Sequence, residues 1–490
     1  MAPHSTSSDA TIDPHPLTPT YGFQPSATQT KLGTAAANPA LLHRSLAHKP
    51  ETVIHASGLT LTLSSGRTII DACGGAAVSC LGHGNEEVLS AAIEQMRKVS
   101  YVHTGAYTTS AAEDLASLIL EHGRQYGLEK AFFCGSGSEA MDAALKLARQ
   151  YFYEMPNRAG RGRKNFVARK QSYHGVTIGA MSVSSNLPRK VPFEPLLLPN
   201  VSHVSPAYAY QYQRKDETEA EYVTRLAKEL DDEFHRLGPE TVIAFVAEPV
   251  VGATTGCVTA PAGYFKAVRE VCDKYGILLI LDEVMCGMGR TGTQFAFEQE
   301  GVVPDIMTMG KGLGGGYAPI AGVVVSKRVV DGLRDGTGMF NHGQTYQAHP
   351  LSCATALAVQ KIIKRENLVQ RCKSMGDILE NLLRESFRSD NNKYVGNIRG
   401  RGLFWGMEFV ADKTTKEAFS PSVEFGLRVQ KKAFDLGVAI YPGAATVDGV
   451  RGDNVLLAPP YTVEEHDLRK IVDVVANAYA EVEREVGAYL

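Results

Sequence analysis

Hydrophobic positions along the chain follow two alternating patterns. Apolar residues recur at helical spacing over 86–99, 111–122 and 139–150. Between and after these segments lie short, continuous apolar runs, at 131–134, 242–247, 277–281, 306–309 and 321–325. Unbroken runs of this length are typical of strands that are covered on both faces of a sheet. Strands that alternate with helices predict an α/β fold with a mostly parallel central sheet.

Both ends of the chain carry a different pattern, which predicts a second, smaller α+β domain. Residues 60–63 and 67–71 are expected to pair as short strands around a turn. A long helix over 352–365 leads away from the sheet, and short strands and helices follow it. We expect residues 36–85 and 367–490 to form this small domain and residues 86–366 to form the large one.

The sequence predicts the least regular structure for the first 35 residues. Residues 1–30 are rich in Ser, Thr, Pro and His, contain no Arg, and include Asp9 and Asp13. A transit peptide is rich in Arg and poor in acidic residues, so this composition argues against one. We expect residues 1–35 to be a flexible tail, or an arm that lies on a partner subunit.

Composition and charge exclude several classes of protein. The formal net charge is −3, which gives no reason to expect a nucleic-acid partner. No apolar run approaches the roughly 20 residues that span a bilayer. The 8 cysteines show no CxxC pair, which is typical of reduced thiols in a cytoplasmic protein. No metal site is expected.

Lys311 and Asp282 form the most informative pair of residues. Asp282 ends the apolar run 277–281, and Lys311 lies among glycines in 310–316, about one strand–helix unit later. Pyridoxal 5′-phosphate (PLP) chemistry needs both groups. The lysine amine forms a Schiff base with the cofactor aldehyde, and the carboxylate keeps the pyridine nitrogen protonated. A loop carboxylate that caps the next turn is the structural alternative for Asp282.

Other segments suit the same cofactor, although each has an alternative. Gly135–Ser138 follows a strand and opens a helix, so its N–H groups and hydroxyls could bind a phosphate. A plain strand-to-helix turn with a Ser cap would look the same. Tyr173, beside His174, could stack on a planar ring, and Val284 could pack on the other face. A Tyr-His pair is more commonly packed at a sheet edge, and a core Val at position 284 could serve both purposes.

A third glycine-rich segment has a competing interpretation. Residues 287–292 match GxGxxG soon after a strand. In a dinucleotide-binding fold the first Gly stands at the strand end, with an acidic residue about 20 positions later. Here residues 282–285 separate the strand from the first Gly, and the next carboxylate that could follow a strand, Asp305, comes earlier than this pattern requires. A nicotinamide oxidoreductase is therefore disfavoured. A catalytically silent binding protein is the other rival outside PLP chemistry.

Together these motifs resemble those of one family. From about residue 36, the chain is similar to a class III (subgroup II, omega-type) aminotransferase of the fold-type I PLP enzymes. The motifs occur in the family's order, at 135–140, 173–175, 247–249, 282–284, 310–312, 342–346 and 349–350.

The resemblance implies a role for individual residues. It implies Lys311 as the Schiff-base lysine and Asp282 as the pyridinium partner. Ser136, Gly137 and Ser138 would bind the phosphate, and Tyr173, flanked by His174, would stack on the ring. Thr345 would reach the phosphate of the neighbouring subunit's cofactor, which implies a homodimer with shared sites.

The chain departs from the family pattern at one position. Ornithine- and GABA-type members have an Arg three residues before a Pro-Pro pair, and that Arg pairs with the Glu of the Glu-Pro motif. Leu456 stands there in this chain, so Glu248 lacks that partner. Amine:pyruvate-type members use a mobile Arg in the preceding loop instead, and Arg451 is the candidate, with an ordinary surface Arg as the alternative. Small residues near Ala77, where the family often has aromatics, would leave room in the pocket entrance.

These residues lead to a functional expectation. We expect an aminotransferase that moves an amino group from an amine or omega-amino donor to a keto acid, with pyruvate favoured over 2-oxoglutarate. A 2-oxoglutarate-dependent amino acid aminotransferase is the alternative. A PLP-dependent decarboxylase or aminomutase of the same family would use the same cofactor site.

Overall fold

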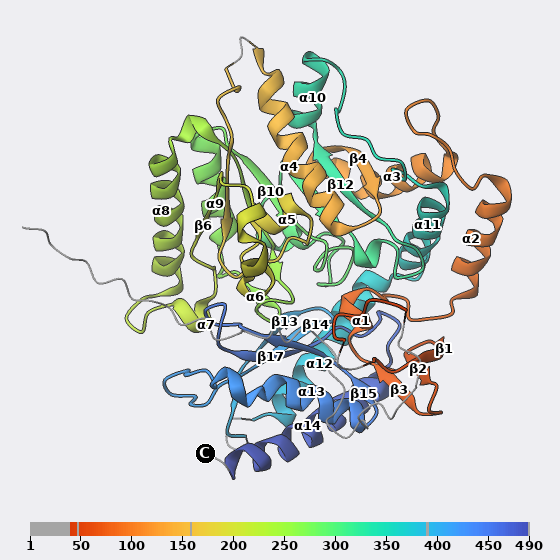
Figure 1. Cartoon of the computed structure of the whole chain (residues 1–490), viewed down its shortest axis with the longest axis vertical. Coiled ribbons are helices and arrows are strands. Elements are labelled where there is room, and N and C mark those ends of the chain that lie inside the picture. Colours follow the sequence, from red (N-terminus) through yellow and green to blue (C-terminus); the bar gives the residue numbers. More distant parts are fainter. Residues whose placement is uncertain (1–39, 47–48, 157–158, 389–391, 489–490) are drawn as a thin grey trace, which may run out of the picture.

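The computed structural model describes residues 40–46, 49–156, 159–388, 392–488. The predicted tail over 1–35 lies outside these residues. In Figure 1 a large upper unit contains the main sheet, and a smaller lower unit contains the C-terminal strands and helices. The β1–β3 strands from the beginning of the described chain lie beside the smaller unit.

The large unit is built on a seven-stranded sheet. Its spatial order is β4 (Leu128–Cys134), β12 (Ala321–Ser326), β11 (Ile306–Met309), β10 (Leu278–Asp282), β7 (Val242–Ala247), β5 (Asn165–Arg169) and β6 (Val201–Val204). Only β12 runs opposite to the others in this sheet, which confirms the predicted mostly parallel arrangement. Every residue of β7, β10 and β11 is buried, as their unbroken apolar sequences predict.

Helices cover both faces of this sheet, and the helices on each face pack their apolar sides against it to form a separate hydrophobic core. One face packs against α3 (Ser110–Gly123), α8 (Glu219–Leu237), α9 (Tyr264–Lys274) and α11 (Pro350–Arg365). The other face packs against α4 (Gly137–Glu154), α5 (Ile178–Val183) and α10 (Lys327–Asp335). Alanines on α4 let this helix approach the sheet closely, because they add little bulk between backbone and strands.

The smaller unit combines both parts of the chain, as predicted. A four-stranded sheet has the order β13 (Val395–Arg401), β14 (Phe404–Phe409), β17 (Asp453–Leu457) and β16 (Tyr441–Ala444). A second sheet joins β1 (Val53–Ser57), β2 (Thr60–Leu63) and β3 (Thr68–Asp71) to β15 (Val438–Ala439). Three helices complete the unit, namely α12 (Leu368–Ser386), α13 (Phe425–Asp435) and α14 (Glu465–Gly487).

The remaining elements lie outside the seven-stranded sheet and the two four-stranded sheets. These are α1 (Gly74–Ala77), α2 (Glu86–Lys98), α6 (Leu187–Lys190), α7 (Ala209–Tyr212), β8 (Val250–Val251) and β9 (Val258–Thr259). Side chains at the carboxyl ends of parallel strands share one edge of the sheet, which is where open α/β folds bind ligands. No helix among the described residues is long and apolar enough to cross a membrane.

Candidate functional site

A cavity of about 240 Å³ lies at this edge of the sheet. It is lined by Gly137, Ser138, Tyr173, His174, Gly175, Glu248, Ala253, Asp282, Val284, Met285 and Lys311. Eight of these residues were predicted as site residues from the sequence. Because they come from the ends of several strands, the fold brings together motifs that are far apart in the chain.

Asp282 is the most firmly held group in the cavity. It ends β10 and is 5% exposed. Its Oδ1 accepts hydrogen bonds from the Val284 N–H and the Thr308 hydroxyl, each at 3.0 Å. The Oδ2 lies 2.8 Å from His174 Nδ1. Partners on both oxygens fix the plane of the carboxylate, so it presents one defined edge to a ligand.

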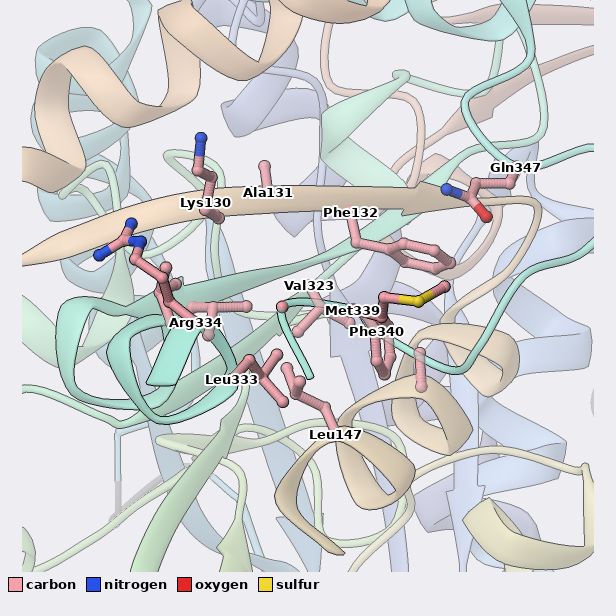
Figure 2. A pocket seen from close by; sticks show the side chains of 14 residues that line it. Lys130, Ala131, Phe132, Leu147, Val323, Leu333, Arg334, Met339, Phe340 and Gln347 are labelled. Carbon is pink, nitrogen blue, oxygen red and sulfur yellow. The ribbon is translucent and has the colours of Figure 1, made fainter. Parts of the chain in front are cut away.

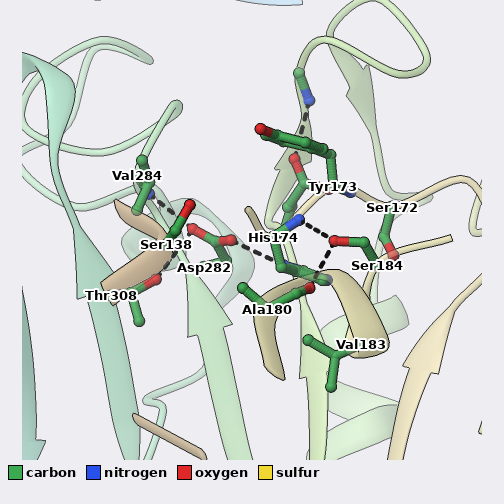
Figure 3. A network of polar contacts seen from close by, with 12 residues as sticks. Ser138, Ser172, Tyr173, His174, Ala180, Val183, Ser184, Asp282, Val284 and Thr308 are labelled. Atoms are coloured by element: carbon green, nitrogen blue, oxygen red, sulfur yellow. Dashed lines mark hydrogen bonds and ion pairs between the residues drawn. The ribbon is translucent and has the colours of Figure 1, made fainter. Parts of the chain in front are cut away.

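His174 is itself oriented by its surroundings. The imidazole is buried, and the backbone N–H of His174 donates to Ser184 Oγ at 2.7 Å. Ser184 in turn donates to the Ala180 carbonyl of α5 at 2.8 Å. Figure 3 shows this chain of contacts from α5 to Asp282. A histidine that is held on one side and bonded to a carboxylate on the other acts as a rigid support.

Lys311 reaches the cavity from the next parallel strand. It follows β11 and begins a single 3₁₀ turn, Lys311–Leu313. Its φ is 44°, in the left-handed region that few non-glycine residues adopt. Strain of this kind persists where the surrounding structure requires a particular side-chain direction. Burial lowers the pKa of the Lys311 amine, against the opposing charges of Asp282 and Glu248.

The start of helix α4 lies on one side of the cavity. Ser136 caps α4, and its Oγ accepts from the Glu139 N–H at 3.3 Å. Ser138 Oγ accepts from the Val176 N–H at 3.0 Å. Gly137 keeps the backbone accessible here, because a Cβ at this position would lie 2.9 Å from Val284 Cγ1. N–H groups at a helix start and two nearby hydroxyls suit a phosphate.

Two side chains flank the space above Asp282. Figure 3 shows Tyr173 and Val284 on either side of the carboxylate. The Tyr173 backbone is fixed, since its N–H donates to Glu248 Oε1 at 3.0 Å. An aromatic face and a branched aliphatic group on opposite sides form a slot for a planar ring. A planar ring bound in this slot would share the cavity with the Asp282 carboxylate and the Lys311 amine.

Comparison with known proteins agrees with this geometry. The family model for class III aminotransferases matches residues 44–479. An uncharacterized aminotransferase of Schizosaccharomyces pombe is 49% identical over 89% of this chain and 94% of its own. Gamma aminobutyrate transaminase 3 of Solanum lycopersicum is 35% identical over 86% of this chain and 79% of its own. A solved omega transaminase of Pseudomonas jessenii, in complex with PMP, superposes with a TM-score of 0.83 at 31% identity, over 89% of this chain and 94% of that one.

The chain belongs to the class III aminotransferase family. It is therefore a fold-type I transaminase that uses PLP. The residues present fit this cofactor. Gly137 leaves room beside Val284 that a Cβ would fill, the start of α4 suits the phosphate, and Asp282 is a buried carboxylate suited to a protonated ring nitrogen.

Four predicted residues of this aminotransferase are not in the cavity lining among the described residues. One of them, Ser136, caps the start of α4 beside the cavity. Ala77 is 2% exposed, has a φ of 60°, and packs in an apolar cluster with Leu456. Arg451 lies in an exposed loop, where its Nε is 2.8 Å from Asp448 Oδ2. Thr345 is exposed on the segment before α11. Their predicted roles remain predictions.

The surroundings of Glu248 and Leu456 show what takes the place of the arginine that is missing at position 456. Glu248 accepts the N–H groups of Tyr173 and Gly252, at 3.0 and 3.2 Å. Burial raises the pKa of its carboxyl. Leu456 is fully buried in a cluster with Val250, Cys286 and Phe404. At position 456 this aminotransferase therefore has a buried aliphatic side chain where ornithine- and GABA-type members of the family are expected to have a cation.

Sequence reasoning missed several residues that shape the site. Thr308 pairs in register with Asp282 across parallel strands, and a hydroxyl at the end of the run 306–309 was the available signal. Gln171, with a φ of 59°, donates to the Thr446 carbonyl at 3.0 Å, and its own carbonyl accepts from Thr254. It thus ties the end of β5 to two loops around the cavity. Nothing in the local sequence marks Gln171 or Ala253.

A second cavity, of about 420 Å³, lies between β4, α4, β12 and α10 (Figure 2). Its lining is mostly apolar, with Lys130 and Arg334 on one side. Arg334 already pairs with Asp331 at 2.6 Å and Glu129 at 3.2 Å. The segment that crosses this cavity, with Met339, Phe340 and Gln347, also carries Thr345.

Proposed function

We propose that this aminotransferase moves an amino group from an amine or omega-amino donor to a keto acid, with pyruvate as the favoured acceptor, through PLP held covalently by Lys311. The observation that carries this proposal is that one cavity joins the Lys311 amine, the Asp282 carboxylate, the Tyr173 ring and the start of α4. Relatives named gamma aminobutyrate transaminases and neighbours named omega transaminases support an amine or omega-amino donor.

The protein's own groups have separate tasks. Bound PLP withdraws electrons from the donor carbon and stores the amino group between two half-reactions. Asp282, supported by His174, holds the proton on the ring nitrogen. Lys311 Nζ, once released by the donor amine, would take the proton from the donor carbon as a general base and, as a general acid, would deliver it to C4′ of the cofactor. The lowered pKa of Lys311 favours the neutral amine that this task needs.

The choice of acceptor follows from the lack of a cation at position 456. Because Leu456 provides no cation, a second substrate carboxylate such as that of 2-oxoglutarate has no fixed partner near Glu248. A buried carboxylate without a partner is strongly destabilised. Pyruvate avoids this cost because it carries only one carboxylate. Arg451, the candidate from the sequence, would have to leave Asp448, and its loop would have to move, to bind that group.

The functional unit in this proposal is a homodimer with shared sites. Thr345 is exposed and lies outside its own subunit's cavity, which is what a residue that serves a neighbour's cofactor phosphate requires. Tyr346 is 63% exposed and packs edge-on against Tyr101, with ring centroids 6.2 Å apart. Exposed aromatic residues of this kind are typical of surfaces that bind another protein.

A substrate panel tests the proposal. Purified holoenzyme is supplied with amine and omega-amino donors, and with either pyruvate or 2-oxoglutarate. Alanine formation from pyruvate, faster than glutamate formation from 2-oxoglutarate, is expected. Preference for 2-oxoglutarate would replace the acceptor assignment by the alternative. Release of carbon dioxide, or turnover without a second substrate, would instead identify a decarboxylase or an aminomutase.

A further inference from the structure

Helix α5 receives its N-terminal cap from another helix. Thr177 stands before its first residue, but the Thr177 hydroxyl caps none of the α5 N–H groups and donates to the Ser138 carbonyl at 3.3 Å. Instead Asp142 of α4, which is half-buried, accepts the Ala180 N–H on Oδ1 at 2.9 Å. Ala180 is the third residue of α5, whose N–H an N-cap side chain normally binds. A helix of six residues is not stable by itself, so α5 depends on such contacts for its position.

Gly179 leaves room for the Asp142 carboxylate. A Cβ at Gly179 would collide with Asp142 Oδ1. The φ of Gly179 lies outside the left-handed region, so its backbone conformation does not itself require glycine. Glycine is less favourable than alanine inside a helix. The contact between α4 and α5 therefore accounts for the glycine at this position.

The same face of α4 also holds the phosphate side of the cavity. Ser138 and Asp142 are one turn apart on α4 and so lie on one face of it. Ser138 lines the cavity, and its Oγ accepts the Val176 N–H at 3.0 Å. Ser138 and Asp142 together hold the segment from Val176 to Ala180 against α4.

From Ala180 the contacts continue to the other end of the cofactor site. The Ala180 carbonyl accepts the Ser184 hydroxyl at 2.8 Å, and Ser184 Oγ accepts the His174 N–H at 2.7 Å. His174 in turn bonds to Asp282 (Figure 3). Asp142 is thus the first member of a chain of contacts that ends on the carboxylate expected to face the ring nitrogen. A change at Asp142 should therefore be felt at Asp282.

We propose that Asp142 is a positioning residue that couples the two ends of the cofactor site. It holds α5, and with it His174 and Asp282, at a fixed position relative to Ser138. Asp142 does not line the cavity, so it acts through these residues rather than on the substrate. The inference rests on the role of Asp282 in the proposed function and deepens it, since it names what keeps that carboxylate in place.

The test compares D142A, which removes the acceptor of the Ala180 N–H, with D142N, which keeps an oxygen there. Three quantities are measured for each purified variant. They are the dissociation constant of PLP from the apoenzyme, the absorbance maximum of the lysine-bound cofactor, and the single-turnover rate and KM with an amine donor. D231A is the matched control, because Asp231 Oδ1 of α8 accepts the Tyr275 hydroxyl at 2.8 Å on the opposite face of the sheet.

D142A should weaken PLP binding and slow single turnover by about 10-fold each, the loss typical of one hydrogen bond to a charged group. Its absorbance maximum should shift, because Asp282 no longer meets the ring nitrogen in the same orientation. KM for the donor should change little, and D142N should stay close to the wild type in all three quantities. D231A should lose thermal stability but keep the affinity, the spectrum and the rate.

G179A provides a second variant that leaves Asp142 in the chain. The added Cβ displaces the carboxylate, so G179A should reproduce the losses of D142A even if D142A itself folds poorly. The double variant D142A/G179A relieves the collision and should be no worse than D142A. S184A breaks the chain of contacts beyond α5, so the rate loss of D142A/S184A should be smaller than the product of the two single losses.

Wild-type behaviour of D142A, losses in D142N as large as those in D142A, or equal losses of affinity and rate in D231A would each overturn the proposal. So would a D142A/S184A loss equal to the product of the single losses. D282N separates this inference from the proposed function. If D282N reacts at the wild-type rate, the role of Asp282 fails, while PLP affinity and the spectrum still decide the Asp142 assignment. If D282N is slow and D142A matches the wild type, only the Asp142 assignment fails.

Discussion

His174 Nδ1 lies 2.8 Å from Asp282 Oδ2, and the two residues come from segments 108 positions apart in the sequence. The imidazole reaches Asp282 from the turn after β5, while the carboxylate ends β10. Because Asp282 Oδ1 is held separately by Val284 and Thr308, the pair fixes the orientation of the carboxylate beneath the slot between Tyr173 and Val284. The electron-withdrawing power of the cofactor depends on this orientation.

Replacing Asp282 by Asn should leave the cofactor bound but slow the chemistry. Asn keeps an oxygen that can accept from Val284 and Thr308, so the cavity should retain its shape. The lost charge no longer holds a proton on the ring nitrogen. We expect a fall of about 10²–10³ in the single-turnover rate, as for removal of a key electrostatic group.

T308V is the matched control for this variant, because it removes one hydrogen bond to Asp282 but keeps the carboxylate. Its single-turnover rate should fall much less. Similar rates in D282N and the wild type would contradict the assigned role of Asp282.

Gly137 provides a test of the cavity's shape. A Cβ at this position would lie 2.9 Å from Val284 Cγ1, so G137A should weaken cofactor binding. Helix stability should not suffer, because Ala is favoured over Gly in helices by about 1 kcal/mol. Equilibrium dialysis against PLP measures the loss. Adding V284A should restore affinity in part, whereas equal affinities for G137A and the wild type would mean that Gly137 does not border the cofactor.

The shared site can be tested by subunit complementation. T345V should weaken PLP binding by about 1.5–3 kcal/mol, the value of a charge-assisted hydrogen bond. K311A subunits should be inactive but still carry Thr345. Mixed dimers of T345V and K311A chains contain one site with both Lys311 and the partner's native threonine, so mixing should restore activity at limiting PLP. A mixture no more active than T345V alone would argue against sharing.

The pKa of Lys311 predicts how cofactor loading depends on pH. Burial disfavours the charged amine, so its pKa is lowered and the neutral form appears at lower pH than for an ordinary lysine. Only the neutral amine attacks the cofactor aldehyde. The rate of PLP uptake by the apoenzyme should rise with pH and level off below the usual lysine pKa of about 10.4. A midpoint at or above that value would show that the amine is not buried in this way.

Periodicity in the sequence was sufficient to predict the central sheet, because strands such as β7 and β10 are buried on both faces and have unbroken apolar sequences. The same signal missed β1 and β13. Most residues of β1 are exposed, and β13 reads VGNIRGR with partly buried positions, so neither has an apolar run. Pairing with neighbouring strands, which a single sequence does not reveal, defines both.

The residues of the site also divide into those that the sequence predicts and those that it does not. Asp282, Lys311 and Gly137 were predictable because each stands at a strand end or helix start with a distinctive residue type. Gln171 was not, since its contacts with Thr446 and Thr254 join segments that are far apart in the sequence and exist only in three dimensions. The left-handed backbone of Ala77, with a φ of 60°, is equally invisible in the sequence.

The absorbance spectrum of the purified protein, recorded before and after addition of an amine donor, tests the central claim most directly. Wild-type protein loaded with PLP should show the band of the lysine-bound cofactor. An amine donor should abolish this band, and pyruvate should restore it. K311A should lack the band and multiple-turnover activity. R469Q, which changes an exposed arginine paired with Glu465 on α14, is the control that should keep both. A K311A protein with normal multiple turnover would contradict the assignment of Lys311, on which the account of this aminotransferase depends.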